Sequence, residues 1–150
     1  MAGESTSIGP VVVGIDGSEA SLTALRHGIR EGEWRGVEVH VVHVLDVTPA
    51  VLHLQGDKTL TTGEVAGGDR AELWRRVEPI LADAGTDVVK VELDGQPGKA
   101  ITAYAEEAGA SVLVVGPRGR GKVEKLFLGS TAQEAIKTAT VDVLVVKAEP

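Results

Sequence analysis

Five short runs of aliphatic, mostly β-branched residues punctuate the chain. They occupy residues 11–15, 37–45, 88–93, 112–115 and 143–146. Each run predicts a β-strand, because β-branched side chains pack well on a pleated surface. The runs at 112–115 and 143–146 are apolar throughout, which is typical of strands in a parallel sheet that is covered on both faces.

Segments with apolar residues at helical spacing separate these runs. The apolar positions are Leu22, Leu25 and Ile29; Leu73, Val77, Ile80 and Leu81; Ile101, Ala105 and Ala108; and Ala132, Ala135, Ile136 and Ala139. Alternating strands and helices imply crossover connections, and these cover both faces of a parallel sheet. The sequence therefore predicts an α/β fold with a single doubly wound domain. Its five-stranded parallel sheet would have the order 3-2-1-4-5, with helices on both faces.

Two segments depart from this pattern. The run at 88–93 alternates, with Val89 and Val91 on one side and Lys90 and Glu92 on the other, which predicts a strand at a sheet edge. Residues 46–68 contain several glycines and are predicted to form one long loop. Such a loop is either a lid over a ligand or a disordered insert, and the sequence leaves both open.

The length of 150 residues fits one domain, with a flexible tail at 1–9 and the folded domain at 10–150. The chain has no cysteine, which excludes disulfides and thiolate metal ligands. The first residues do not resemble a secretory signal, and no apolar run approaches the roughly 20 residues needed to span a bilayer. We therefore expect a cytoplasmic protein with no membrane partner.

The formal net charge of −7 argues against nucleic-acid binding, which needs clustered cations to neutralise phosphates. Four cations nevertheless lie close together, at Arg118, Arg120, Lys122 and Lys125. A basic spot on an acidic molecule suits a small polyanion, and the alternative is an ordinary solvated loop.

Ligands in open α/β sheets bind at the carboxyl ends of the strands where the strand order reverses, here between the first and fourth strands. The fourth run continues into a stretch with Gly116, Gly119 and Gly121, which allow positive φ and a close approach of backbone amides to an anion. Residues 129–131 then precede the last helix, where Ser130 would offer a capping hydroxyl beside free amides. The alternative is that these residues only form turns and caps.

Residues 116–122 also match part of a Walker A loop. However, Val123 stands where the Mg²⁺-binding Ser or Thr belongs, and residues 124–129 intervene before the expected helix. A P-loop NTPase is therefore not expected.

The pattern Gly116-x2-Gly119-x9-Gly129-Ser130 has the spacing of the G-x2-G-x9-G-[S/T] signature in the ATP-binding branch of the universal stress protein family. The chain resembles this family over nearly its whole length, because residues 11–18, 43–46 and 143–146 are similar to the family's first, second and last strands. The resemblance implies ATP as the ligand, with the presence of Mg²⁺ left open. Pro117 departs from the family pattern and removes a hydroxyl and a backbone donor, and Asp142 departs only at the start of the last strand.

By this resemblance, Asp16 and Val44 would hold the adenosine. Gly116, Gly119, Gly129, Ser130 and Thr131 would hold the phosphates and ribose. The candidate binding set also includes Gly14, Arg118, Arg120, Gly121 and Lys122. An Asp-Gly-Ser sequence after a strand is also an ordinary turn. Because Ser18 can cap the next helix unaided, we expect the Asp16 carboxylate to be free to bind a ribose or an adenine amine.

No catalytic or metal site is predicted. His40 and His43 would face opposite sides of their strand, while His27 and His53 lie on other segments. The sequence has no Gly-x-Ser-x-Gly elbow and no supported nucleophile–base pair.

We therefore expect an ATP-binding regulatory module of the stress response, with slow or no turnover. The alternatives are an ATP hydrolase or adenylate-handling enzyme, disfavoured by the missing base, and a dimeric interaction protein without nucleotide, disfavoured by the intact glycines.

The last run would form a sheet edge of four aliphatic residues, Val143, Leu144, Val145 and Val146, with no charge among them. Exposed edges of this kind invite pairing with another chain. We therefore predict a homodimer through this strand, to which the family resemblance also points. The alternative is a monomer whose edge is masked by the helix that packs on it.

Overall fold

A five-stranded sheet forms the centre of the molecule. The computed structural model describes residues 8–46, 52–53, 59–60, 62–118 and 128–147. The strands of this sheet are β1 (Val11–Ile15), β2 (Val39–Leu45), β5 (Val88–Asp94), β6 (Val112–Val115) and β7 (Val143–Val145). Their order is β5-β2-β1-β6-β7, and all neighbouring strands are parallel. The predicted order 3-2-1-4-5 is confirmed.

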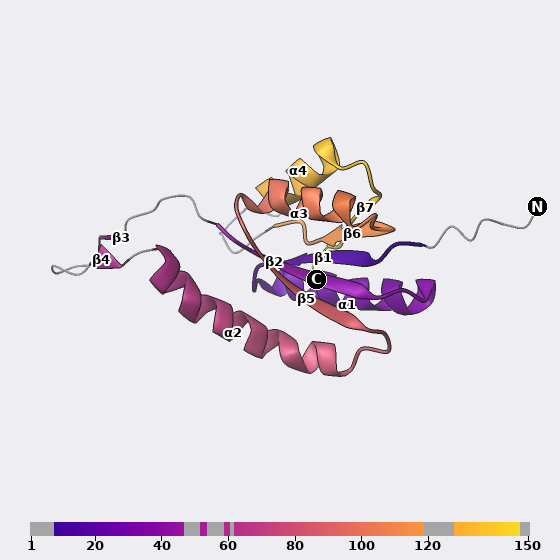
Figure 1. Cartoon of the computed structure of the whole chain (residues 1–150), viewed down its shortest axis with the longest axis horizontal. Coiled ribbons are helices and arrows are strands. Elements are labelled where there is room, and N and C mark those ends of the chain that lie inside the picture. Colours follow the sequence, from indigo (N-terminus) through magenta and orange to yellow (C-terminus); the bar gives the residue numbers. More distant parts are fainter. Residues whose placement is uncertain (1–7, 47–51, 54–58, 61, 119–127, 148–150) are drawn as a thin grey trace, which may run out of the picture.

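Helices cover both faces of this sheet, as predicted (Figure 1). One face carries α1 (Glu19–Arg35) and α2 (Thr62–Ala82), and the other carries α3 (Pro97–Glu107) and α4 (Ser130–Thr138). Side chains alternate along each strand between two cores, so that Val11 packs on the α1 side and Val12 on the α3 side. Within the described part of the chain, no helix is long and apolar enough to cross a membrane.

Two glycines let α1 lie very close to the sheet. A Cβ atom at Gly28 would lie 2.2 Å from Cγ2 of Val13, and one at Gly32 would lie 2.4 Å from Cγ2 of Val39. A larger residue at either position would push the helix away from the strands. This close packing holds the carboxyl-terminal half of α1 against β1 and β2.

The prediction of one long loop at 46–68 is only partly correct. It contains two short antiparallel strands, β3 (Leu52–His53) and β4 (Thr59–Leu60), and α2 begins at Thr62. Glycines at 63, 67 and 68 lie within this helix, because each costs only about 1 kcal/mol relative to alanine and does not prevent helical hydrogen bonding. Residues 47–51, 54–58 and 61 lie outside the described residues, so neither alternative, a lid or a disordered insert, is tested.

Strand β5 lies at a sheet edge, as predicted from its alternation. Its polar side nevertheless faces α2. Nζ of Lys90 lies 2.6 Å from Oε2 of Glu78, and Nε1 of Trp74 donates to Oε1 of Glu92 at 2.5 Å. The charged side of β5 therefore binds a helix through polar contacts.

Candidate functional site

A cavity of about 230 Å³ opens at the carboxyl ends of β1 and β6. These strands are neighbours, and the strand order reverses between them, which is where ligands bind in open α/β sheets. The cavity is lined by Gly14, Ile15, Asp16, Ser21, Val44, Pro97, Ile101, Val115, Gly116, Arg118, Gly129, Ser130, Thr131 and Ala132. The structure thus brings together the predicted site residues Gly14, Asp16, Val44, Gly116, Arg118, Gly129, Ser130 and Thr131. The predicted residues Gly119, Arg120, Gly121 and Lys122 lie outside the described residues.

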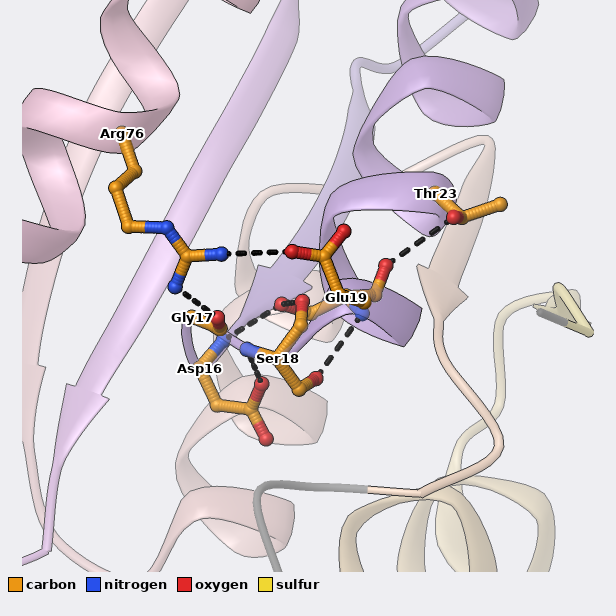
Figure 2. Close-up of polar contacts among 7 residues, drawn as sticks. Asp16, Gly17, Ser18, Glu19, Thr23 and Arg76 are labelled. Atoms are coloured by element: carbon orange, nitrogen blue, oxygen red, sulfur yellow. Dashed lines mark hydrogen bonds and ion pairs between the residues drawn. The ribbon is translucent and has the colours of Figure 1, made fainter. Parts of the chain in front are cut away.

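The loop after β1 presents the Asp16 carboxylate at the cavity. The N–H of Ser18 donates to Oδ1 of Asp16 at 2.9 Å (Figure 2). Ser18 is the N-cap of α1, and its hydroxyl oxygen accepts the N–H of Ser21 at 3.1 Å. The expected capping by Ser18 is confirmed, and the Ser18 N–H also occupies one oxygen of the Asp16 carboxylate, which the sequence did not indicate. One carboxylate oxygen closes a turn with the backbone, and this turn orients the second oxygen.

The amino end of α4 also borders the cavity. Its N-cap is Gly129, which makes no side-chain capping hydrogen bond, so the expectation that Ser130 caps the helix is wrong. The reason is that the helix begins one residue earlier than the capping pattern indicates, with Ser130 in its first turn. The N–H of Gln133 donates to the Gly129 carbonyl at 3.0 Å and closes this turn. The amides of Ser130, Thr131 and Ala132 precede the first intrahelical bond and lie at the wall of the cavity.

The ends of the glycine-rich stretch meet beside the cavity. The N–H of Gly129 donates to the Pro117 carbonyl at 2.6 Å. The Gly129 amide is therefore already bonded, and Pro117 keeps a structural role through its carbonyl although it has no N–H. Arg118, the next residue, lines the cavity.

Gly116 does not use the positive φ that glycine allows, and its lack of a side chain matters for packing instead. A Cβ atom here would lie 3.1 Å from the carbonyl carbon and oxygen of Ala20 in α1. Among the described residues, the glycines with positive φ are Gly17, Gly36, Gly95 and Gly109. Gly116 therefore lets α1 and the end of β6 approach each other at the cavity wall.

An apolar wall faces the Asp16 loop, and part of it was not predicted. Ile15 and Val44 come from the carboxyl ends of β1 and β2, while Pro97 and Ile101 come from α3. Pro97 opens α3 three residues after β5 ends, so the rule that ligands bind at strand carboxyl ends could have indicated it. Ile101 also contacts Gly14 closely, since a Cβ atom at Gly14 would lie 2.7 Å from Cδ1 of Ile101.

The histidines on β2 lie on opposite faces of the sheet, as predicted. Nδ1 of His40 lies 2.7 Å from the hydroxyl of Tyr104 on α3. Nδ1 of His43 lies 3.1 Å from the Glu92 carboxylate on the α2 side. Within the described ranges, no group of three or more His, Cys, Asp or Glu residues is placed to hold a metal ion.

Comparisons with known proteins agree with this architecture. The family model described as the universal stress protein family matches residues 8–147. Universal stress protein MJ0531 of Methanocaldococcus jannaschii is 33% identical over 138 residues, which cover 91% of this chain and 81% of that protein. A universal stress protein of Mycolicibacterium smegmatis is 32% identical over 145 residues, and the match covers 92% of this chain but 45% of that protein.

Solved structures are also similar. A universal stress protein in complex with cAMP has a TM-score of 0.70 and 25% identity, and the match covers 95% of this chain and 100% of that one. The universal stress protein from Archaeoglobus fulgidus in complex with dAMP has a TM-score of 0.66 and 25% identity, with 92% and 97% of the two chains covered. The family model spans almost all of the described fold, including every segment that lines the cavity. The chain therefore belongs to the universal stress protein family.

Proposed function

We propose that this protein is a regulatory module that binds ATP, with slow or no turnover. The observation that supports this most strongly is the convergence of three kinds of surface in one cavity. These are the Asp16 carboxylate, an apolar wall, and the amino end of α4 with Arg118 beside it. Together they match the amine and hydroxyl groups, the flat base and the phosphates of a nucleotide.

The base and ribose would lie between the Asp16 loop and the apolar wall. Val44, Pro97 and Ile101 offer the apolar surface that a purine ring needs. The second oxygen of Asp16 would accept a hydrogen bond from a ribose hydroxyl or an adenine amine. The similar structures that hold cAMP and dAMP support an adenine nucleotide.

The phosphates would lie at the amino end of α4. Unbonded amides and the positive end of a helix dipole favour anions, and the absence of a capping side chain leaves this position open to a ligand. Arg118 adds a permanent positive charge to the lining of the same cavity. The resemblance of the spacing from Gly116 to Ser130 to the signature of the family's ATP-binding branch supports a triphosphate as the natural ligand.

The cavity favours binding over catalysis. The ionisable side chains among its lining residues are those of Asp16 and Arg118. One oxygen of Asp16 accepts the Ser18 N–H and the other is assigned to the ribose or adenine amine, while a guanidinium stays protonated and does not act as a base. Efficient hydrolysis needs a group that can take a proton from water, so we assign this cavity to binding.

The experiment that tests this function asks which ligand the protein carries. Mass spectrometry of molecules released from heat-denatured purified protein should detect an adenine nucleotide. Isothermal titration of ligand-stripped protein with ATP, AMP and GTP, with and without Mg²⁺, should then show tighter binding of ATP than of the other two. The proposal would be contradicted if the protein bound none of the three nucleotides.

The placement of the phosphates is tested by Gly129→Glu. Gly129 has φ −69°, so a side chain is tolerated by the backbone, and the added carboxylate would lie at the amino end of α4. We expect the Kd for ATP to rise by at least about tenfold, because like charges repel strongly in a partly enclosed site. The matched control is Ala71→Glu, which adds the same charge on an exposed position of α2. Equal ATP affinity of folded Gly129→Glu and wild type would refute the placement.

We also propose that two copies of the chain pair through β7. This strand lies at the second edge of the sheet, beside β6 alone. Its side chains are half-buried and belong to the two cores, so its free backbone groups, and not its side chains, are what a partner would bind.

A further inference from the structure

Arg76 on α2 contacts the loop that carries Asp16, although it is remote from that loop in the sequence. Its Nη1 donates to the Gly17 carbonyl at 2.6 Å, and its Nη2 lies 2.9 Å from Oε1 of Glu19 (Figure 2). Both terminal nitrogens of one guanidinium therefore bind the segment that runs from the end of β1 into the first residue of α1.

The two contacts differ in their importance. The Glu19 side chain is 82% exposed, so its ion pair with Arg76 is screened by water and contributes little. The bond to the Gly17 carbonyl is short and partly buried, and its donor is charged. Charge-assisted hydrogen bonds of this kind are about twice as strong as neutral ones.

The Gly17–Ser18 peptide group joins Arg76 to Asp16. The carbonyl of this group accepts from Arg76, and its N–H donates to Oδ1 of Asp16 at 2.9 Å. Because a peptide group is planar, its carbonyl and N–H turn together. A rotation that broke the bond to Arg76 would therefore also break the bond that orients the Asp16 carboxylate.

Gly17 gives this peptide group freedom to rotate. Its φ of +87° is a conformation that other residues rarely adopt, and a glycine exchanges between such conformations at little cost. The orientation seen here is thus fixed mainly by the partners at its two ends. A guanidinium on the carbonyl also polarises the peptide group, which strengthens its N–H as a donor to Asp16.

We propose that Arg76 is a positioning residue for nucleotide binding, which acts through the Gly17–Ser18 peptide group to hold the Asp16 carboxylate toward the ligand. This inference rests on the proposed function of the cavity. It also implies that α2, whose side of the sheet lies opposite α3 and α4, is coupled to the occupancy of the site. A ligand that requires the oriented carboxylate favours the position in which Arg76 is bound to Gly17. By linkage, Arg76 in that position raises the affinity for the ligand by the same factor.

Variants of Arg76 are expected to fold. Leu73 and Val77 anchor α2 in the core with exposed fractions of 5% and 0%, whereas 40% of the Arg76 side chain is exposed. Arg76→Gln removes the charge and the forked donor and leaves these apolar contacts in place. Two controls are available: Arg75→Gln makes the same change at the neighbouring exposed position, and Glu19→Gln removes the ion pair alone.

The test measures ATP affinity of these variants by isothermal titration. We expect Arg76→Gln to raise the Kd by about tenfold, as for the loss of one hydrogen bond to a charged group. The Arg75→Gln and Glu19→Gln proteins should bind ATP as the unmodified protein does. If Arg76 acts through Asp16, adding Arg76→Gln to an Asp16→Ala background should change the Kd much less, since no carboxylate remains to be positioned.

Hydrogen exchange of the ligand-free protein supplies a readout that does not depend on ATP. The Ser18 amide should exchange faster in Arg76→Gln and at an unchanged rate in Glu19→Gln. Lack of ATP binding by the unmodified protein would overturn the proposed function together with this inference. Normal binding with equal affinity for Arg76→Gln, or an effect of equal size in the Asp16→Ala background, would overturn the inference alone.

Discussion

Tyr104 shows how neighbouring groups set the ionisation of one side chain. Its hydroxyl lies 2.7 Å from Nδ1 of His40, and Nε2 of His40 lies 2.8 Å from Oε1 of Glu38. Burial is the main cause that raises the pKa of Tyr104, and the negative charge of Glu38 raises it further. Both effects disfavour the phenolate in the folded protein.

This raised pKa predicts a loss of stability in alkaline solution. The unfolded chain releases the Tyr104 proton near pH 10, before the folded protein does, so the free energy of unfolding should fall as the pH rises from about 10 to the folded pKa. Urea unfolding from pH 9 to 11 should show this decrease, and Tyr104→Phe should lack this contribution. The sequence contains one tyrosine, so phenolate absorbance reports on it directly. A phenolate titration at the ordinary value in the folded protein would contradict the prediction.

At the scale of single elements, β7 shows which backbone groups remain for a partner. The N–H of Leu113 donates to the Asp142 carbonyl at 2.8 Å, and the N–H of Val146 donates to the Val115 carbonyl at 2.9 Å. Because alternate residues of a parallel strand face the same neighbour, the backbone groups of Val143 and Val145 point away from β6. The free edge therefore presents the N–H and carbonyl groups of these two residues.

Val145→Pro tests the proposed dimer at this edge. Proline is tolerated in edge strands where the lost N–H faces outward, so the sheet should keep its pairing with β6 while the donor to a partner disappears. Light scattering at micromolar concentration should show a dimer for the unmodified protein and a monomer for Val145→Pro. Val145→Thr, which keeps the N–H and nearly the same shape, should remain dimeric. An unmodified protein that is already monomeric would refute the dimer and leave the ATP proposal intact.

The fold of the whole molecule explains why the cavity is expected to bind ATP and to hydrolyse it slowly or not at all. The described lining of the cavity comes from five separate stretches, at residues 14–21, 44, 97–101, 115–118 and 129–132, which meet at the carboxyl edge of the sheet. Such an arrangement supplies many contacts to a nucleotide, but the ionisable groups among the lining residues are a tethered carboxylate and a guanidinium. Binding energy alone does not activate water for attack on a phosphate.

Steady-state turnover of ATP should therefore remain far below the enzyme median of about 10 per second. A coupled phosphate-release assay with purified protein measures this rate. Comparison with Gly129→Glu, which should lose ATP binding, identifies any contaminating hydrolase, because a contaminant would be equally active in both preparations. A rate of several per second that disappears in the variant would favour the enzyme alternative.

The sequence by itself determined the order of the elements and much of the cavity. The strands at 11–15, 112–115 and 143–146 are recognisable because local side-chain patterns report burial on both faces of a sheet. The carboxyl-end rule and the spacing from Gly116 to Ser130 then indicated where a ligand would bind, and eight predicted residues line the cavity found there. These features are local in sequence or follow from topology, so no coordinates were needed to infer them.

Only the tertiary structure decided how these residues are held. The bond from Gly129 to Pro117, the close contact of Gly116 with Ala20 and the contribution of Pro97 depend on segments that fold against one another. Arg76 is the clearest case, because nothing in its neighbours along the chain indicates a contact with Gly17. Hydrogen bonds between remote segments depend on the distances and directions that packing imposes, and a one-dimensional pattern of polar and apolar residues does not contain that information.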